Sequence, residues 1–122
     1  MDIEVLQGQK VLLVEDESLV AMLAEDMLAD LGADVVLAMR FPEGLHQAQQ
    51  GEFALAVLDV NLGGGHRSDP IADILAHRGV PFLFVTGYGE RGPAERHAGK
   101  TILQKPYHAS EFGDALARAL DD

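Results

Sequence analysis

Short apolar runs recur along the chain, and longer segments with helical spacing separate them. The runs lie at residues 11–14, 35–38, 53–58, 81–85 and 101–103. Each is rich in Val, Leu, Ile or Phe and is continuous rather than alternating with polar residues. Such runs are typical of strands that are buried on both faces, as in a parallel sheet.

The segments between the runs predict helices. The clearest is 18–31, where Leu19, Leu23 and Met27 form an apolar stripe that continues to Leu28 or Leu31, and Gly32 supplies a C-terminal stop. We expect Glu25, Asp26 and Asp30 to lie on the solvent side of this helix.

A second strong helical pattern covers 110–120, with Phe112, Leu116 and Leu120 on one stripe. Weaker patterns cover 42–50 and 68–78. The segment 89–99 is the least helical, because Gly92 and Pro93 interrupt it, and we expect a short or mobile element there.

Strands that alternate with helices imply βαβ units, and right-handed crossovers favour a doubly wound α/β domain with a five-stranded parallel sheet. The length of 122 residues suits a single domain spanning 1–122. In such sheets, ligands bind at the carboxyl ends of the strands. Polar side chains follow four of the predicted strands: Glu15 and Asp16, Asp59, Thr86 and Lys105.

Composition narrows the class of partner. The formal net charge is −11, from 20 acidic and 9 basic side chains, which disfavours direct binding to nucleic acid. No segment is long and apolar enough for a membrane span, and the N-terminus lacks a signal-peptide pattern, so we expect a cytoplasmic protein. The chain has no cysteine, which excludes disulfides and thiolate metal sites.

The acidic residues at the strand ends predict a cation site. Carboxylate and carbonyl oxygens are the ligands that Mg²⁺ prefers. Glu15, Asp16 and Asp59 supply carboxylates, and the backbone carbonyl of Asn61 adds another oxygen. A dication would also relieve the repulsion within the acidic run "EDES".

A structural reading of "EDES" is also open. Asp16 or Ser18 can cap the first helix, and Glu17 can favour its positive end. Asp59 tips the balance toward a metal site, because it is a further acid at the end of an otherwise apolar strand. A carboxylate of this kind can attack phosphorus, with Lys105 neutralising the transferred group and the Thr86 hydroxyl donating to it.

Four motifs carry a resemblance to a known family: "VEDE" at 14–17, "LDVNL" at 58–62, "FVTGY" at 84–88 and "LQKPY" at 103–107. In this order the chain resembles the receiver domain of bacterial two-component response regulators, over nearly its whole length. The resemblance implies a CheY-like sheet with strand order 2-1-3-4-5 and a cis Lys105–Pro106 bond.

The resemblance also implies the roles of the site residues. Asp59 would accept a phosphoryl group, Thr86 would bind it and Lys105 would pair with it. Glu15 and Asp16 would hold Mg²⁺ together with Asp59 and the Asn61 carbonyl. The expected function is that of a phosphoacceptor in a histidine kinase phosphorelay, with no enzyme activity beyond its own phosphotransfer and dephosphorylation.

Within that family, "PFLFVTGYGE" is similar to the signature of the FAT GUY receivers, although Val85 replaces an alanine. The likeness implies a sensor histidine kinase of the HWE or HisKA2 class, or a phosphotransfer protein, as phosphodonor. Signalling would then pass to an unidentified downstream protein.

The sequence departs from the family at several positions. Ile102 stands where receivers carry an aromatic switch residue, and we hypothesise that Tyr88 takes over part of the signalling; a half-exposed loop aromatic is the alternative. The loop 61–70 reads as a flexible entry to the third helix. We expect the five histidines to be surface residues: His46, His66, His77, His97 and His108.

Other function classes fit these residues less well. A phosphatase of the haloacid-dehalogenase kind would need an aspartate at position 61, where Asn61 stands. A flavodoxin-like cofactor carrier would need a hydroxyl-rich loop where "EDES" lies. A phosphate sink and a receiver-like binding module that takes no phosphate stay open. Output through protein contacts is expected if the chain is complete, and another domain could supply it otherwise.

Overall fold

The computed structural model describes residues 6–87 and 89–121. Five strands alternate with helices, as predicted, and apart from the segment 89–99 the predicted bounds differ from the observed ones by a couple of residues at most. In chain order the elements are β1 (Lys10–Val14), α1 (Ser18–Asp30), β2 (Asp34–Ala38), α2 (Phe41–Gln50), β3 (Leu55–Asp59), α3 (Asp69–His77), β4 (Phe82–Thr86), the 3-10 helix η2 (Glu95–His97), β5 (Ile102–Gln104) and α4 (Ala109–Asp121).

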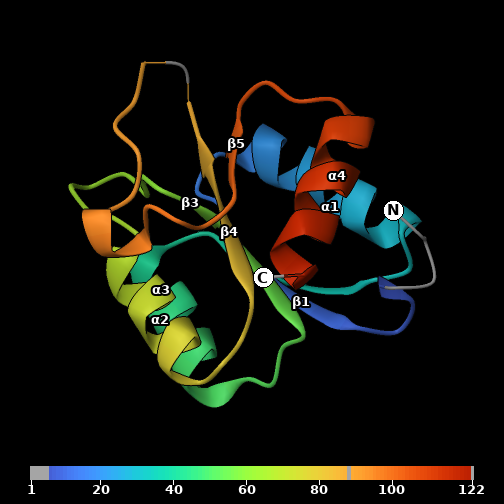
Figure 1. Cartoon of the computed structure of the whole chain (residues 1–122), viewed down its shortest axis with the longest axis horizontal. Coiled ribbons are helices and arrows are strands. Elements are labelled where there is room, and N and C mark those ends of the chain that lie inside the picture. Colours follow the sequence, from blue (N-terminus) through green and yellow to red (C-terminus); the bar gives the residue numbers. More distant parts are fainter. Residues whose placement is uncertain (1–5, 88, 122) are drawn as a thin grey trace.

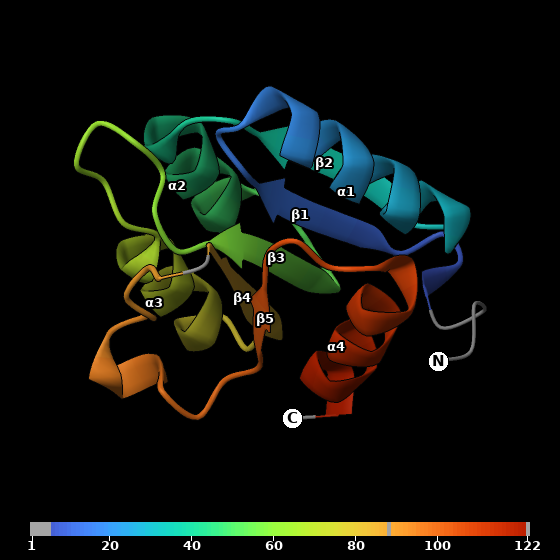
Figure 2. The ribbon, with the colours of Figure 1, turned by 90° about the horizontal axis from the view of Figure 1, so that it is seen from above.

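The strands form one parallel sheet in the order β2-β1-β3-β4-β5, which confirms the predicted topology. Helices α1 and α4 cover one face of the sheet, and α2 and α3 cover the other (Figures 1 and 2). The Lys105–Pro106 peptide bond is cis, as the family resemblance implied. No helix in the ranges 6–87 and 89–121 is long and apolar enough to cross a bilayer.

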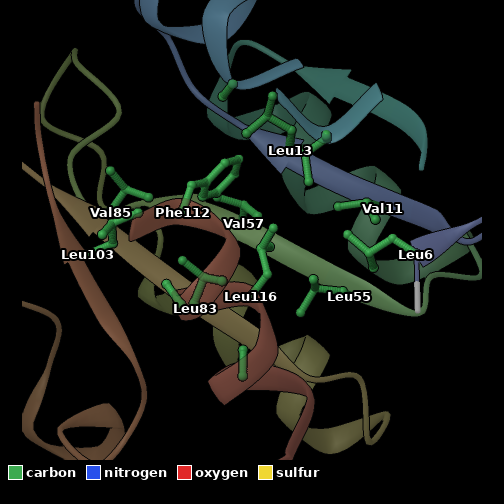
Figure 3. Close-up of a cluster of buried hydrophobic side chains, with 14 residues drawn as sticks. Leu6, Val11, Leu13, Leu55, Val57, Leu83, Val85, Leu103, Phe112 and Leu116 are labelled. Carbon is green, nitrogen blue, oxygen red and sulfur yellow. The ribbon is translucent and has the colours of Figure 1, made fainter. Parts of the chain in front are cut away.

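Continuous apolar strands build a core on each side of the sheet, because successive side chains point to opposite faces. In β1, Val11 and Leu13 join the cluster under α1 and α4, whereas Leu12 and Val14 join the cluster under α2 and α3. Figure 3 shows the first cluster, in which Phe112 of α4 projects toward the sheet. Burial on both faces leaves only the strand ends free to carry polar chemistry.

Helix α1 turns a different face to the sheet than its largest side chains predict. Leu19 and Leu23 were expected on the apolar stripe but are 67% and 51% exposed, whereas Ala21, Ala24 and Leu28 are buried. Small residues at this spacing let the helix pack close to the strands. The prediction for this stripe was therefore wrong for Leu19 and Leu23, whereas Leu28 is buried and Met27 and Leu31 pack against the core. An apolar surface remains on the outside of α1.

Within the described part of the fourth crossover, which joins β4 to β5, the single turn η2 is the only helical element, so the prediction of a short element is confirmed. The prediction that His97 lies on the surface is wrong, because this side chain is 5% exposed. Its ring lies 5.7 Å from the ring of Phe82 and 5.8 Å from that of Phe84. With no full helix over this part of β4, His97 itself covers the strand. The other four histidines are exposed, as predicted.

Polar contacts tie this crossover to α3. Asp73 accepts two hydrogen bonds from the Arg96 guanidinium, at 2.8 and 2.9 Å, and lies 2.7 Å from Nε2 of His97. Asp69 accepts from the backbone N–H of Ala94 at 2.8 Å. These contacts fix residues 94–97 beside α3.

Candidate phosphoacceptor site

The predicted residues meet at the carboxyl edge of the sheet because all five strands run in the same direction. Glu15 follows β1, Asp59 ends β3, Thr86 ends β4 and Lys105 follows β5. The arrowheads of β1 and β3 point to the same edge in Figure 2. Glu15, Asp59 and Thr86 are all buried, which is unusual for polar groups and indicates a built site rather than a solvated edge.

Lys105 lies at the centre of the site. Its ammonium donates to Glu15 Oε1 at 3.1 Å, to Glu17 Oε1 at 3.2 Å and to Asp59 Oδ2 at 3.3 Å. Its backbone N–H donates to the carbonyl of Thr86 at 2.7 Å, which fixes the start of the segment after β5. One cation therefore gathers three carboxylates from two different strand ends.

The charges in the site remain unbalanced, because three carboxylates face one ammonium. Burial and the neighbouring Glu15 together raise the pKa of Asp59 to about 8. Lys105 lowers this pKa, but its effect is smaller than that of Glu15. Burial also acts to lower the pKa of Lys105, but the charges of Asp59 and Glu15 outweigh it and hold that pKa above its usual value. Burial, with Glu15, raises the pKa of the neighbouring Tyr107 to about 12.

The geometry fits a divalent cation. Asp59 Oδ2 is engaged by Lys105, whereas Asp59 Oδ1 is buried and has no hydrogen-bond partner among the described residues. Oxygens of Glu15, Glu17 and Asp59 lie within 4.8 Å of one another. A hard cation bound by carboxylates would use the free oxygen and offset the excess negative charge.

Sequence reasoning placed Asp16 in this group and overlooked Glu17. Side chains alternate in direction along extended backbone, and Glu17 is still extended, with φ −91° and ψ 116°. Glu15 and Glu17 consequently point the same way toward Lys105. Asp16 points toward the loop after β3, where a Cβ added to Gly63 would lie 2.8 Å from its Oδ2. The two-residue period was the signal that could have identified Glu17.

Asn61 starts a tight turn beside the site. It forms an antiparallel bridge with Arg67, and the glycines at the tip, Gly63 to Gly65, all have positive φ. The amide Nδ2 of Asn61 donates to Glu90 Oε2 at 2.7 Å. Glu90 was not among the predicted site residues. It is far from Asn61 in the sequence, and no sequence pattern connects the two residues.

The predictions for Ile102 and Tyr88, the residues linked to switching, have different outcomes. Ile102 lies on β5 and is 43% exposed, so this side chain is not packed in the core. Tyr88 lies outside the described residues, and the hypothesis that it takes part in signalling stays a prediction.

The family model for the response regulator receiver domain matches residues 11–117. Among curated proteins, the phyllosphere-induced regulator PhyR of Methylorubrum extorquens AM1 is 30% identical over 91% of this chain and 43% of its own length. The transcriptional regulatory protein PdtaR of Mycobacterium tuberculosis is 28% identical over 98% of this chain and 60% of its own length. The chain thus spans less than two thirds of each of these relatives.

Two solved structures match this chain over nearly their whole length. The solution structure of SdrG from Sphingomonas melonis Fr1 is 38% identical, covers 93% of this chain and 97% of its own, and superposes with a TM-score of 0.83. The receiver domain of the sensor histidine kinase PA1611 from Pseudomonas aeruginosa is 25% identical over 94% of this chain and 99% of its own, with a TM-score of 0.79. That structure has a magnesium ion coordinated in its active site cleft.

Proposed function

Because this chain belongs to the response regulator receiver domain family of two-component systems, we propose that Asp59 accepts a phosphoryl group from a histidine kinase or phosphotransfer protein. The observation that carries the proposal is the state of Asp59 itself. Its carboxylate is buried, Lys105 holds one of its oxygens, and the other oxygen has no partner among the described residues.

The Asp59 carboxylate is the nucleophile in this proposal. One of its oxygens forms a bond to phosphorus while the bond from phosphorus to the donor atom breaks, and the bonding electrons leave with the donor, so that the other oxygen stays available to a cation. If the donor is phosphohistidine, the departing imidazole takes a proton from solvent. Lys105 neutralises charge on the transferred group, and the Thr86 hydroxyl at the end of β4 donates to one of its oxygens.

Mg²⁺ is the cation that the donor set fits. When bound, it would neutralise charge on the carboxylates and on the transferred phosphoryl group. Lys105 already engages Glu15, Glu17 and Asp59 Oδ2, so the free Oδ1 of Asp59 is the remaining anchor. We assign Asp16, which lies against the loop after β3, and the backbone carbonyl of Asn61 as further ligands, with Glu15 completing the acidic group.

The phosphodonor protein has to reach this edge of the sheet, and an apolar surface borders it. Leu19, Met22 and Leu23 of α1 are exposed. A groove beside them is lined by Val20, Leu23, Met27, Lys105, Pro106 and Tyr107. We assign this surface to the kinase or phosphotransfer protein, because binding there would bring a phosphohistidine next to Lys105.

Other expectations become part of the same proposal. The donor is a kinase of the HWE or HisKA2 class, by the likeness to FAT GUY receivers, and the protein acts in the cytoplasm. Its chemistry is limited to accepting and losing its own phosphoryl group. Phosphorylation alters binding to a downstream protein.

The test is the intact mass of the protein after incubation with acetyl phosphate, with and without Mg²⁺. We expect a gain of one phosphoryl group that requires Mg²⁺ and is absent from Asp59→Asn. The matched control is Asp26→Asn, which removes an exposed carboxylate of α1 and should leave the gain unchanged. A gain that persists in Asp59→Asn would contradict the assignment.

A further inference from the structure

A further carboxylate, that of Glu90, lies at the edge of the site although it comes from the fourth crossover. It accepts a hydrogen bond from Asn61 Nδ2 at 2.7 Å, and Asn61 follows Asp59 by two residues. The backbone N–H of Glu90 donates to the carbonyl of Gly87 at 3.2 Å. This turn brings the side chain back over the end of β4.

The carboxylate of Glu90 lies directly against the backbone of Gly87, the residue that follows Thr86. A Cβ added at Gly87 would collide with Oε1 of Glu90, so only glycine leaves room for this approach. Glu90 is an exposed glutamate, and such a side chain is ionised at neutral pH.

These contacts define an anion position beside Asn61, which follows Asp59 by two residues, and Gly87, which follows Thr86. An amide N–H of Asn61, the backbone of Gly87 and the charge of Lys105 are also the groups that an added phosphoryl group on Asp59 would seek. A carboxylate and a phosphoryl group cannot share them without strong repulsion, because both are negative.

We propose that Glu90 is a positioning residue that occupies the anion position of the unphosphorylated protein and is displaced when a phosphoryl group forms on Asp59. Glu90 thereby lowers the affinity of the site for the phosphoryl group, and its displacement frees the start of the fourth crossover. This proposal rests on the proposed phosphorylation of Asp59.

The contacts of the crossover limit how far such a change extends. Arg67 Nη2 donates to the carbonyl of Gly92 at 2.8 Å, and Asp69 accepts from the N–H of Ala94 at 2.8 Å. The residues from Gly92 onward stay tied to α3 and to the loop that precedes it by these contacts. Release of Glu90 therefore affects Gly87 and the residues 89–91, next to β4.

The test compares Glu90→Gln with Glu95→Gln. The first substitution removes the charge with little change in shape, and the second removes an exposed charge of the same crossover away from Asn61. The probe is beryllofluoride with Mg²⁺, a phosphoryl analogue that binds aspartate. Binding is followed through the side-chain amide signal of Asn61 in ¹H–¹⁵N spectra, and acetyl phosphate is used in parallel with intact mass as readout.

We expect beryllofluoride to shift the Asn61 amide signal of the wild-type protein. Glu90→Gln should bind the probe about fivefold more tightly than the wild type. Because Glu90 is exposed, salt screens its charge, so the difference in affinity between the two proteins should be larger at low ionic strength. Glu95→Gln should match the wild type. If the wild type binds beryllofluoride but Glu90→Gln binds it no more tightly, the proposed role of Glu90 is refuted, whereas the proposed function of Asp59 stands. If the wild type takes neither probe, the function of Asp59 falls as well.

Discussion

Substitution of Asp59 by Asn should stabilise the protein in the absence of divalent cations, although it removes the proposed phosphoacceptor. Asp59 is 3% exposed and lies beside Glu15, so its charge is costly in the folded state. Asparagine has nearly the same shape, carries no charge and can still accept a hydrogen bond from Lys105.

The sign of the effect follows from the pKa. The pKa of Asp59 rises from 3.8 to about 8 on folding, so between these values the folded protein binds more protons than the unfolded chain. The wild-type protein therefore loses stability relative to Asp59→Asn as pH rises through this window. Each pH unit is worth about 1.4 kcal/mol when the whole shift is realised. Because Glu15 and Lys105 can move to relieve the repulsion, we expect a difference of about 2 kcal/mol at pH 8.

The assay is urea or thermal unfolding in EDTA, followed by circular dichroism at several pH values. A difference of about 2 kcal/mol corresponds to about 8 °C in melting temperature for a domain of this size. At pH 4 the two proteins should differ little, and Mg²⁺ at pH 8 should stabilise the wild type more than the variant. Equal or lower stability of Asp59→Asn at pH 8 in EDTA would refute the reasoning.

Three further predictions concern other parts of the molecule. Asp16→Asn should abolish the Mg²⁺-dependent phosphorylation by acetyl phosphate, whereas Glu17→Gln should retain it; the opposite result would place the cation at the Glu17 side of Asp59. Leu23→Ser should reduce the rate of phosphotransfer from a cognate kinase about tenfold, as expected for an apolar anchor of an interface, and leave acetyl phosphate labelling unchanged. Equal loss with both donors would indicate damage to the site instead. Phe112→Ala should lower the free energy of unfolding by about 3–4 kcal/mol, because the ring is fully buried under α4; a loss below about 1 kcal/mol in urea unfolding would contradict its place in the core.

The site could be predicted from sequence because it depends on strand direction. Once the apolar runs were assigned to a parallel sheet, Glu15, Asp59, Thr86 and Lys105 had to lie at one edge, however far apart they are in the chain. The topology and the buried stripe of the last helix around Phe112 followed from the same periodicities.

The tertiary structure decided features that depend on packing between distant segments. Helix α1 is apolar on more than one side, so its periodicity alone does not choose between the stripe of Leu23 and that of Ala24. His97 is buried because the crossover lacks a full helix, and nothing within the crossover itself encodes that space.

The same distinction holds within the site. Local sequence determines which groups follow each strand, because strand length and direction are encoded by short apolar runs. The direction in which Asp16 and Glu17 point, and the meeting of Asn61 with Glu90, depend on how loops fold over one another in space. Contacts of that kind join residues with no shared period, so only the folded chain determines them.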